Sequence, residues 1–377
     1  MEKAIKKRAS NIELLRIIAM LMIIVHHIVA HCISTQLTDQ GSIKRLGNGL
    51  FSTPAFFKKI YLLSAIYPLG LTGNAIFMLI SGYFMVARGK NIDLLKISKK
   101  LLMQFFFSVA VLVLVSNVVF HLWGSLHYIS MVSFMDYTDM SWYIGYYFSV
   151  IVLAVLFLND FLLKRTKREY EIFLVIIFAV TQFLFTFSLL RGLSFYLSIL
   201  AEGVFLYSFG GYIQKYDPFS RLHIFVFFLV IIAVFALIYV SYYNVTLTNI
   251  ETFNRDQSDK PFVQAVVTHG NQSIMALLIA ICLFEIFRRI KLPASKVINF
   301  LGASTLMVYL IHDNNFFYSL WNMKDWITDL HDSPLMFLLD LAKWGGATFM
   351  AGVLTYVAYL LFGKLLNKSK SIFLKKS

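Results

Sequence analysis

Apolar runs as long as a lipid bilayer is thick recur along this chain of 377 residues. The hydrocarbon core of a membrane is about 30 Å across, and a helix needs roughly 20 apolar residues to cross it. A helix also pairs its own backbone N–H and C=O groups, for which lipid offers no hydrogen-bond partners. The sequence therefore predicts an all-α, polytopic membrane helix bundle of about ten transmembrane helices. The predicted spans are 12–33, 66–86, 97–120, 142–163, 172–190, 194–214, 223–243, 272–287, 303–321 and 335–361.

Composition favours a single membrane domain over residues 1–377. Hydrophobic residues make up 59% of the chain and charged residues 14%, whereas roughly a quarter of a typical soluble domain is charged. No stretch has soluble composition for long enough to form a second domain. The first apolar run contains Glu13 and Arg16 and is not followed by a small-residue cleavage site. We therefore expect it to remain as the first span and not to be a signal peptide.

The net charge of +14 is explained by where the basic residues lie. In a soluble protein it would suggest nucleic acid, but membrane proteins concentrate lysine and arginine in their cytoplasmic loops. Basic clusters alternate here with more acidic loops, so both termini are predicted to be cytoplasmic and no nucleic-acid partner is expected. The clusters lie near the N-terminus, at 88–100, 164–168, 215–221 and 288–296, and in the C-terminal tail.

Two longer outer segments and two cysteines complete this outline. Residues 35–65 are predicted to include an interfacial helix, and residues 244–271 a polar surface loop. Cys32 and Cys282 fall in or beside apolar runs without the spacing of a zinc site. Neither a disulfide framework nor a bound metal is expected from them.

Ionisable residues are dense in the first span, where charge is costly and usually faces a cavity or a partner. Glu13 and Arg16 are three residues apart, which predicts an ion pair on one helical turn. Arg16 and His27 are eleven apart, so both fall on one face, roughly 16 Å apart along the axis. His31 follows on the same side, and His26 points elsewhere. A neutral histidine here can act as a general base, or it can be a packed, hydrogen-bonded core residue.

The segment 11–27 resembles the first-span signature of the membrane acyltransferase-3 family. That signature has an acidic residue, an arginine three positions later and a histidine after ten more residues, which match Glu13, Arg16 and His27. Further resemblances follow in the order of the family and together extend over nearly the whole chain. They lie at 70–83, 140–144, 205–213 and 308–314.

The resemblance implies an acyltransferase of the bacterial cell membrane. Most members of the family are O-acetyltransferases that modify surface polysaccharides or their lipid-linked precursors, with no bound cofactor and with cytoplasmic acetyl-CoA as the donor. The resemblance implies His27 as the catalytic residue, with Arg16 and Glu13 on the donor side. Expected acceptor contacts are Trp142, Tyr143, Tyr309 and His312. An aromatic belt at the membrane boundary explains the Trp142–Tyr143 pair equally well.

One departure concerns the donor phosphates. Many members carry an arginine-rich stretch after the second span, where this chain has Lys96, Lys99 and Lys100. Lysine offers phosphate a point charge, although not a bidentate contact, so Lys99 and Lys100 are predicted donor contacts. The small residues of Ser81-Gly82 and Gly210-Gly211 are predicted to allow close helix packing.

A transporter or flippase for a lipid-linked sugar or small solute is the rival function. Intramembrane charge and broken helices are also typical of transporters. A sensor or scaffold is a third class, which predicts no chemical change in any glycan. The acceptor sugar and the oligomeric state are left open by the sequence.

Overall fold

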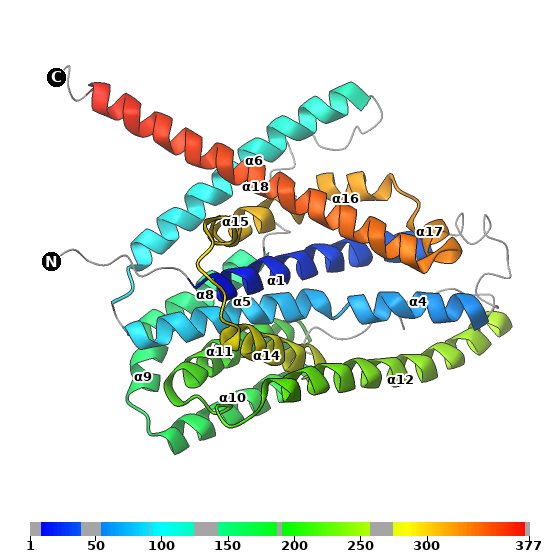
Figure 1. The fold of residues 1–377 in the computed structure, drawn as a ribbon, viewed down its shortest axis with the longest axis horizontal. Coiled ribbons are helices and arrows are strands. Elements are labelled where there is room, and N and C mark those ends of the chain that lie inside the picture. Colours follow the sequence, from blue (N-terminus) through cyan, green and yellow to red (C-terminus); the bar gives the residue numbers. More distant parts are fainter. Residues whose placement is uncertain are drawn as a thin grey trace.

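The computed structural model describes residues 9–38, 54–89, 91–123, 142–186, 191–256 and 274–373, and all regular structure in these ranges is helical. The long first helix continues without interruption through a π-helical turn (Figure 1). The helical elements are α1 (Ser10–Ile28), η1 (Val29–Ile33), α2 (Ser34–Thr38), α4 (Pro54–Ile66), α5 (Leu69–Met85), η2 (Val86–Arg88), α6 (Leu94–Trp123), α8 (Trp142–Leu153), η4 (Ala154–Leu158), α9 (Asn159–Leu163), α10 (Lys167–Thr186), α11 (Arg191–Tyr216), α12 (Ile224–Asp256), α14 (Ile274–Arg289), α15 (Lys296–His312), α16 (Asn315–Asn322), α17 (Trp326–Asp332) and α18 (Pro334–Phe373).

Six helical segments of the described chain are long and apolar enough to cross a membrane, which confirms the predicted all-α membrane character. The remaining four predicted spans coincide with α10, α11, α14 and α15, which are helical but are not among these six segments. Ten crossings and cytoplasmic termini therefore stay predictions. The six segments are Ser10–Leu37, Lys59–Arg88, Leu94–Ser116, Trp142–Leu163, Ile224–Ser241 and Pro334–Lys368.

Two predicted boundaries were wrong. The span predicted at 303–321 is two helices, because the chain leaves helical geometry at Asp313 and the side chain of Asn314 accepts a hydrogen bond from the backbone N–H of Phe317. Such a cap competes with continuation of the helix. The loop predicted at 244–271 begins as helix, since α12 extends to Asp256 through a stretch without glycine or proline.

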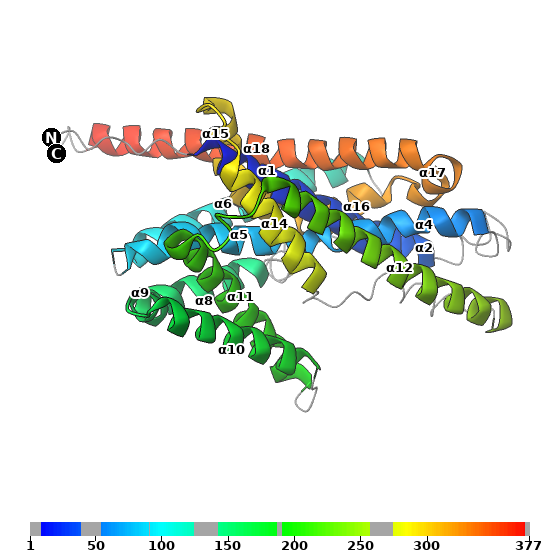
Figure 2. The same ribbon diagram turned by 60° about the horizontal axis from the view of Figure 1, so that its bottom comes forward.

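Helix α1 is the central element of the bundle. It packs against α5, α14, α15 and α18, and both views place α15 and α18 on one side of the α1–α5 pair and α10 and α11 on the other (Figures 1 and 2). Two buried apolar clusters form the core. One joins α1 to α15, α16 and α18, and the other joins α5 to α8 and α11. The part of α1 that carries His26 and His27 contributes Ile24 and Ile28 to the first cluster.

Glycines allow α5 and α11 to cross at very short range, which confirms the packing role predicted for them. A Cβ atom at Gly82 would overlap the backbone carbonyl of Tyr207, and one at Gly210 would overlap that of Leu79. Small residues that bring helix backbones together are a common means of association in membranes.

Replacing Gly82 by alanine is expected to destabilise the folded protein, because backbone atoms of α11 have no rotamer with which to move aside. Overpacking of this kind costs about 1–3 kcal/mol. The midpoint of thermal unfolding in detergent should fall by several degrees. The matched control is Gly346→Ala in α18, where a Cβ meets no atom of the described part of the chain within 4 Å. An equal loss in both variants would contradict the packing argument.

Polar contacts join the predicted cytoplasmic connections at one end of the bundle. The side chain of Asn11 donates to the carbonyl of Phe287 (2.8 Å), so the start of α1 is tied to the end of α14. The guanidinium of Arg288 in turn pairs with Asp217 after α11 (2.6 Å). In Figure 1 the start of α1 and the end of α18 both lie toward the left. This grouping agrees with the predicted alternation of basic loops.

Candidate functional site

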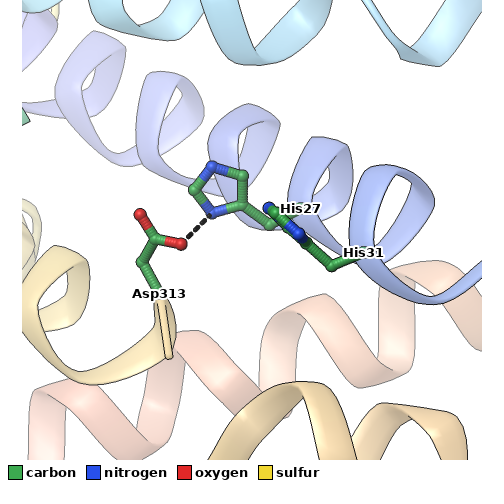
Figure 3. Close-up of side chains that lie close together, drawn as sticks. All are labelled: His27, His31 and Asp313. Carbon is green, nitrogen blue, oxygen red and sulfur yellow. Dashed lines mark ion pairs between the residues drawn. The ribbon is translucent and has the colours of Figure 1, made fainter. Parts of the chain in front are cut away.

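His27 contacts two polar residues from the end of α15. Its Nδ1 atom lies 3.0 Å from Nε2 of His312 and 3.4 Å from Oδ1 of Asp313 (Figure 3). The side chain of His27 is 12% exposed and that of Asp313 5% exposed. The break between α15 and α16 is what places His312 and Asp313 against α1.

The hydrogen bonds around these rings determine which nitrogen of His27 is reactive. Nδ1 of His312 lies 2.8 Å from the carbonyl of Val308, which can only accept, so Nδ1 carries the hydrogen and Nε2 is an acceptor. Nδ1 of His27 therefore faces two acceptors, His312 Nε2 and Asp313 Oδ1, and is assigned as the N–H donor. Nε2 of His27 keeps its lone pair, and it lies on the far side of the ring from Asp313 (Figure 3).

The carboxylate of Asp313 is held by two tyrosines. Tyr318 donates a hydrogen bond to Oδ1, and Tyr309 donates to Oδ2 over 3.4 Å. A buried carboxylate fixed in this way orients a neighbouring imidazole and balances the positive charge that forms when the ring takes up a proton. The pair His27–Asp313 has the geometry of a general base with its orienting acid.

The two other histidines of the first span have different surroundings. Nδ1 of His26 lies 2.6 Å from the carbonyl of Tyr67, and its ring fills the space that a Cβ at Gly70 would need. His31 is exposed, and its ring stacks on Tyr318 with centroids 4.2 Å apart. His26 is thus a packing residue, whereas His31 lies on the exposed flank of the cluster.

His27, His31 and Asp313 also bring three potential metal-ligand atoms within 4.8 Å of one another. Two imidazoles and a carboxylate are a ligand set that suits Zn²⁺. Nδ1 of His27 and both oxygens of Asp313 are already engaged in the contacts described above. The hydrogen bonds account for the arrangement, and the function proposed below uses no metal.

A cavity of about 270 Å³ lies between α1, α5, α6, α8 and α15. Two cations, Arg16 and Lys100, line it, and much of its wall is aliphatic or aromatic. Hydroxyl groups supply most of its remaining polar lining, and the residues that carry them include Ser81, Tyr143, Tyr147 and Tyr309. The cavity therefore combines positive charge, an apolar wall and hydrogen-bonding groups.

Two residues connect this cavity to His27, which does not itself line it. Ile23 lines the cavity and lies one helical turn before His27 on α1. Tyr309 lines the cavity with its ring and bonds to Asp313 with its hydroxyl. The cavity thus ends about one helical turn from the reactive histidine.

The predicted donor contacts are only partly brought together. Arg16 and Lys100 line the cavity, whereas Lys99 is exposed and does not. The guanidinium of Arg16 lies 3.3 Å from the buried carboxylate of Glu13, which confirms the predicted ion pair. A Cβ at Gly302 would overlap that carboxylate, so this glycine leaves the space that Glu13 occupies.

The predicted acceptor contacts divide in a similar way. Tyr143 and Tyr309 line the cavity with ring centroids 5.5 Å apart, and His312 belongs to the His27 cluster. Trp142 is 47% exposed and lies against Tyr143 without lining the cavity.

Several residues of the site were not singled out by sequence reasoning. Tyr318 and Tyr147 carried no signal beyond their residue type. Asn74 accepts a hydrogen bond from Tyr143 through its backbone carbonyl (3.1 Å). Its buried side-chain Oδ1 has no hydrogen-bond partner in the described part of the chain. Asp313 was considered together with His312, either as part of the acceptor site or as an interfacial polar residue, but its pairing with His27 was not predicted.

Comparison with known proteins identifies the family of this chain. A family model described as an acyltransferase domain matches residues 10–363, which include every residue of the cluster and of the cavity. The chain matches no curated protein and no solved structure. Since the family model extends over nearly the whole sequence, the chain belongs to the acyltransferase-3 family.

Proposed function

We propose that this membrane acyltransferase moves an acetyl group from cytoplasmic acetyl-CoA to a hydroxyl of a surface polysaccharide or its lipid-linked precursor. The observation that carries the proposal is the His27–Asp313 pair, in which Nδ1 of His27 is engaged and Nε2 keeps its lone pair. A bacterial cytoplasmic membrane is the proposed location, with the chain crossing it several times.

In the reaction, Nε2 of His27 takes the proton of the acceptor hydroxyl. The hydroxyl oxygen attacks the thioester carbonyl carbon, the carbon–sulfur bond breaks, and the thiol of CoA leaves with the proton that His27 returns. Asp313 offsets the positive charge that His27 carries between the two proton transfers. A route through an acetyl group held on Nε2 uses the same residues and the same balance of atoms.

The cavity supports a thioester donor. Its volume of about 270 Å³ suits an extended acyl-thioester arm and not a whole nucleotide. Arg16 and Lys100 supply positive charge for phosphate, which arginine contacts bidentately and lysine as a point charge. The acetyl end would then lie near Tyr309, beside the group that orients His27.

Aromatic and polar groups near the Tyr309 end of the cavity support binding of a sugar acceptor. Tyr143 and Tyr309 line the cavity. Oδ1 of Asn74, next to the backbone carbonyl that accepts from Tyr143, has no hydrogen-bond partner among the described residues, and we propose that it accepts from an O–H or N–H group of a substrate. An unsatisfied buried acceptor costs about 1–3 kcal/mol, so a substrate that donates to it would bind more tightly.

The test is transfer of labelled acetyl from acetyl-CoA by the purified protein in lipid nanodiscs. Ester acetyls on surface glycans, scored by NMR in a deletion strain and its complemented strain, report the same activity in cells. Loss of the ester signal on deletion and its return with the wild-type chain support the proposal. If acetylation is identical in all strains and glycan export changes, the chain acts as a transporter.

Replacement of Arg16 by alanine is expected to weaken binding of the acetyl donor and to leave the rate of the chemical step nearly unchanged. Loss of a charge-assisted phosphate contact corresponds to about 1.5–3 kcal/mol, so KM for acetyl-CoA should rise about tenfold or more while kcat changes little. Arg16→Lys should recover part of the affinity. Lys296→Ala, which removes an exposed cation at the start of α15, is the control and should leave KM unchanged.

A further inference from the structure

A second cavity, of about 310 Å³, lies between α6 and α8. Its walls are hydrocarbon, with Leu102, Phe105 and Phe148 among them. The one hydroxyl in the lining, on Ser98, already donates to the carbonyl of Leu94 over 2.8 Å. A ligand in this groove therefore finds dispersion contacts and no hydrogen bonds. Such a lining fits an alkyl or polyisoprenyl chain.

The groove adjoins the reaction cavity. Leu101 of α6 and Ile144 of α8 line both of them and stand between them. On the reaction side of these two residues the lining becomes polar, with the hydroxyls of Ser81 and Tyr147 lying 3.2 Å apart. Across this shared wall the lining thus changes from hydrocarbon to hydrogen-bonding groups.

The outer edge of the groove is open where α8 lacks a side chain. Gly145 is exposed, and a Cβ built on it meets no atom of the described residues within 4 Å. The neighbouring surface of α6 is apolar as well as exposed, with Leu102 54% and Phe106 56% exposed. Both helices belong to segments apolar enough to cross a membrane. The exposed surface around the opening is therefore apolar and suits contact with lipid better than contact with water.

We propose that the groove between α6 and α8 holds the hydrocarbon chain of a lipid-linked acceptor, whose hydroxyl-bearing head group reaches the reaction cavity past Leu101 and Ile144. The inference rests on the function proposed above and selects the lipid-linked acceptor over the free polysaccharide. The acceptor enters sideways from the bilayer, and the donor binds where Arg16 and Lys100 supply charge.

Other occupants fit these observations less well. The acyl group of an acetyl donor has only two carbons, too few to extend beyond Leu101 and Ile144 into the groove. A bulk phospholipid leaves its head group at the membrane surface, so its chains explain the apolar lining but not the position of the groove beside a hydroxyl-lined cavity. A molecule with a hydrocarbon chain and a sugar head group matches both the apolar groove and the polar cavity next to it.

Gly145→Trp tests the proposal, because an indole at this position fills the open edge of the groove. Gly346→Trp on α18 is the matched control, since it also places an indole in open space but at a helix that does not line the groove. Both variants are compared with wild type only after equal insertion and equal thermal unfolding have been verified.

Activity is measured in nanodiscs of phosphatidylethanolamine and phosphatidylglycerol with labelled acetyl-CoA. The acceptors are methyl and hexadecyl glycosides of glucose, galactose and N-acetylglucosamine. Wild type should favour the hexadecyl member of at least one pair, and Gly145→Trp should lower the hexadecyl-to-methyl ratio about tenfold, or about 1.4 kcal/mol. Gly346→Trp should keep the wild-type ratio. Equal ratios in all three proteins, or an effect that follows the length of the donor acyl group, would overturn the proposal.

Binding is measured separately, so that the groove is tested even if none of these sugars is acetylated. A hexadecyl glycoside with a diazirine in its chain should label 98–105 and 144–148 in wild type and in Gly346→Trp, with a clear loss in Gly145→Trp. The same label on a phosphatidylcholine chain should be spread over the lipid-facing helices. Identical patterns for the two probes mean bulk lipid in the groove and reject the inference. Absence of acetyl transfer to any acceptor contradicts the proposed function alone.

Discussion

Replacing His27 by alanine is expected to abolish acetyl transfer while the protein still inserts and folds. Nε2 of His27 is the ring nitrogen with an available lone pair beside Asp313. Removing a general base lowers a rate by about 10²- to 10⁴-fold, and a covalent route would lose more. The measurement is labelled acetyl transfer per folded molecule, together with the ester acetyls of surface glycans.

The control for this variant is His26→Ala, which removes the neighbouring ring. His26 bonds to the carbonyl of Tyr67 and packs on Gly70, so its loss should lower stability more than the rate per folded molecule. Wild-type acetylation in His27→Ala would contradict the enzyme assignment of this residue. A change in export of an unmodified solute, with acetylation intact, would instead indicate a transporter.

Replacing Asp313 by asparagine is expected to cause the second large loss of activity. The amide is nearly the same shape as the carboxylate, but it carries no charge and can turn an N–H group toward Nδ1 of His27. We expect kcat to fall on the order of 10²-fold or more, as when the orienting acid of a Ser-His-Asp triad is made neutral. KM for acetyl-CoA should stay close to wild type, because Asp313 does not line the donor cavity.

Two further variants separate orientation from general destabilisation. Asp332→Asn removes a carboxylate that is 67% exposed and pairs with His331, and it should leave kcat unchanged. Tyr318→Phe removes a hydrogen bond to Asp313 and should lower kcat less than Asp313→Asn does. A fall in kcat and a rise in KM of equal size in Asp313→Asn would mean that the residue acts only by holding the fold.

Much of the fold was predictable because a long apolar run in lipid has to satisfy its backbone hydrogen bonds internally, which favours a helix. The predicted span at 142–163 matches an observed segment at both ends. The break at Asp313–Asn314 was not predicted, since it depends on a side-chain cap in place of a helical hydrogen bond. Hydropathy also did not indicate that α12 continues to Asp256, because the segment 244–256 is polar and rich in Asn and Thr, whose helix propensity is weak.

Contacts of the site within a single helix were predictable from the sequence, whereas contacts between different helices were not. The pairing of Glu13 with Arg16 follows from helical spacing alone. Lys99 and Lys100 are equivalent in sequence terms, yet adjacent positions point about 100° apart on a helix, and Lys100 is the one that lines the cavity. The partnership of His27 with Asp313 joins residues on α1 and beyond α15, so it depends on tertiary packing that no local pattern reports.

The end of α15 beside His27 also has an electrostatic consequence that involves no side chain. The C-terminus of a helix carries a partial negative charge, equivalent to about half an electron, from its unpaired carbonyl groups. Because α15 ends at His312, whose ring contacts His27, this field acts on the imidazole and partly balances the positive charge that the ring carries between the two proton transfers. Substitution of Asp313 leaves the backbone field in place. The rate that survives in Asp313→Asn therefore includes the contribution of the helix terminus, which only a change in where α15 ends would remove.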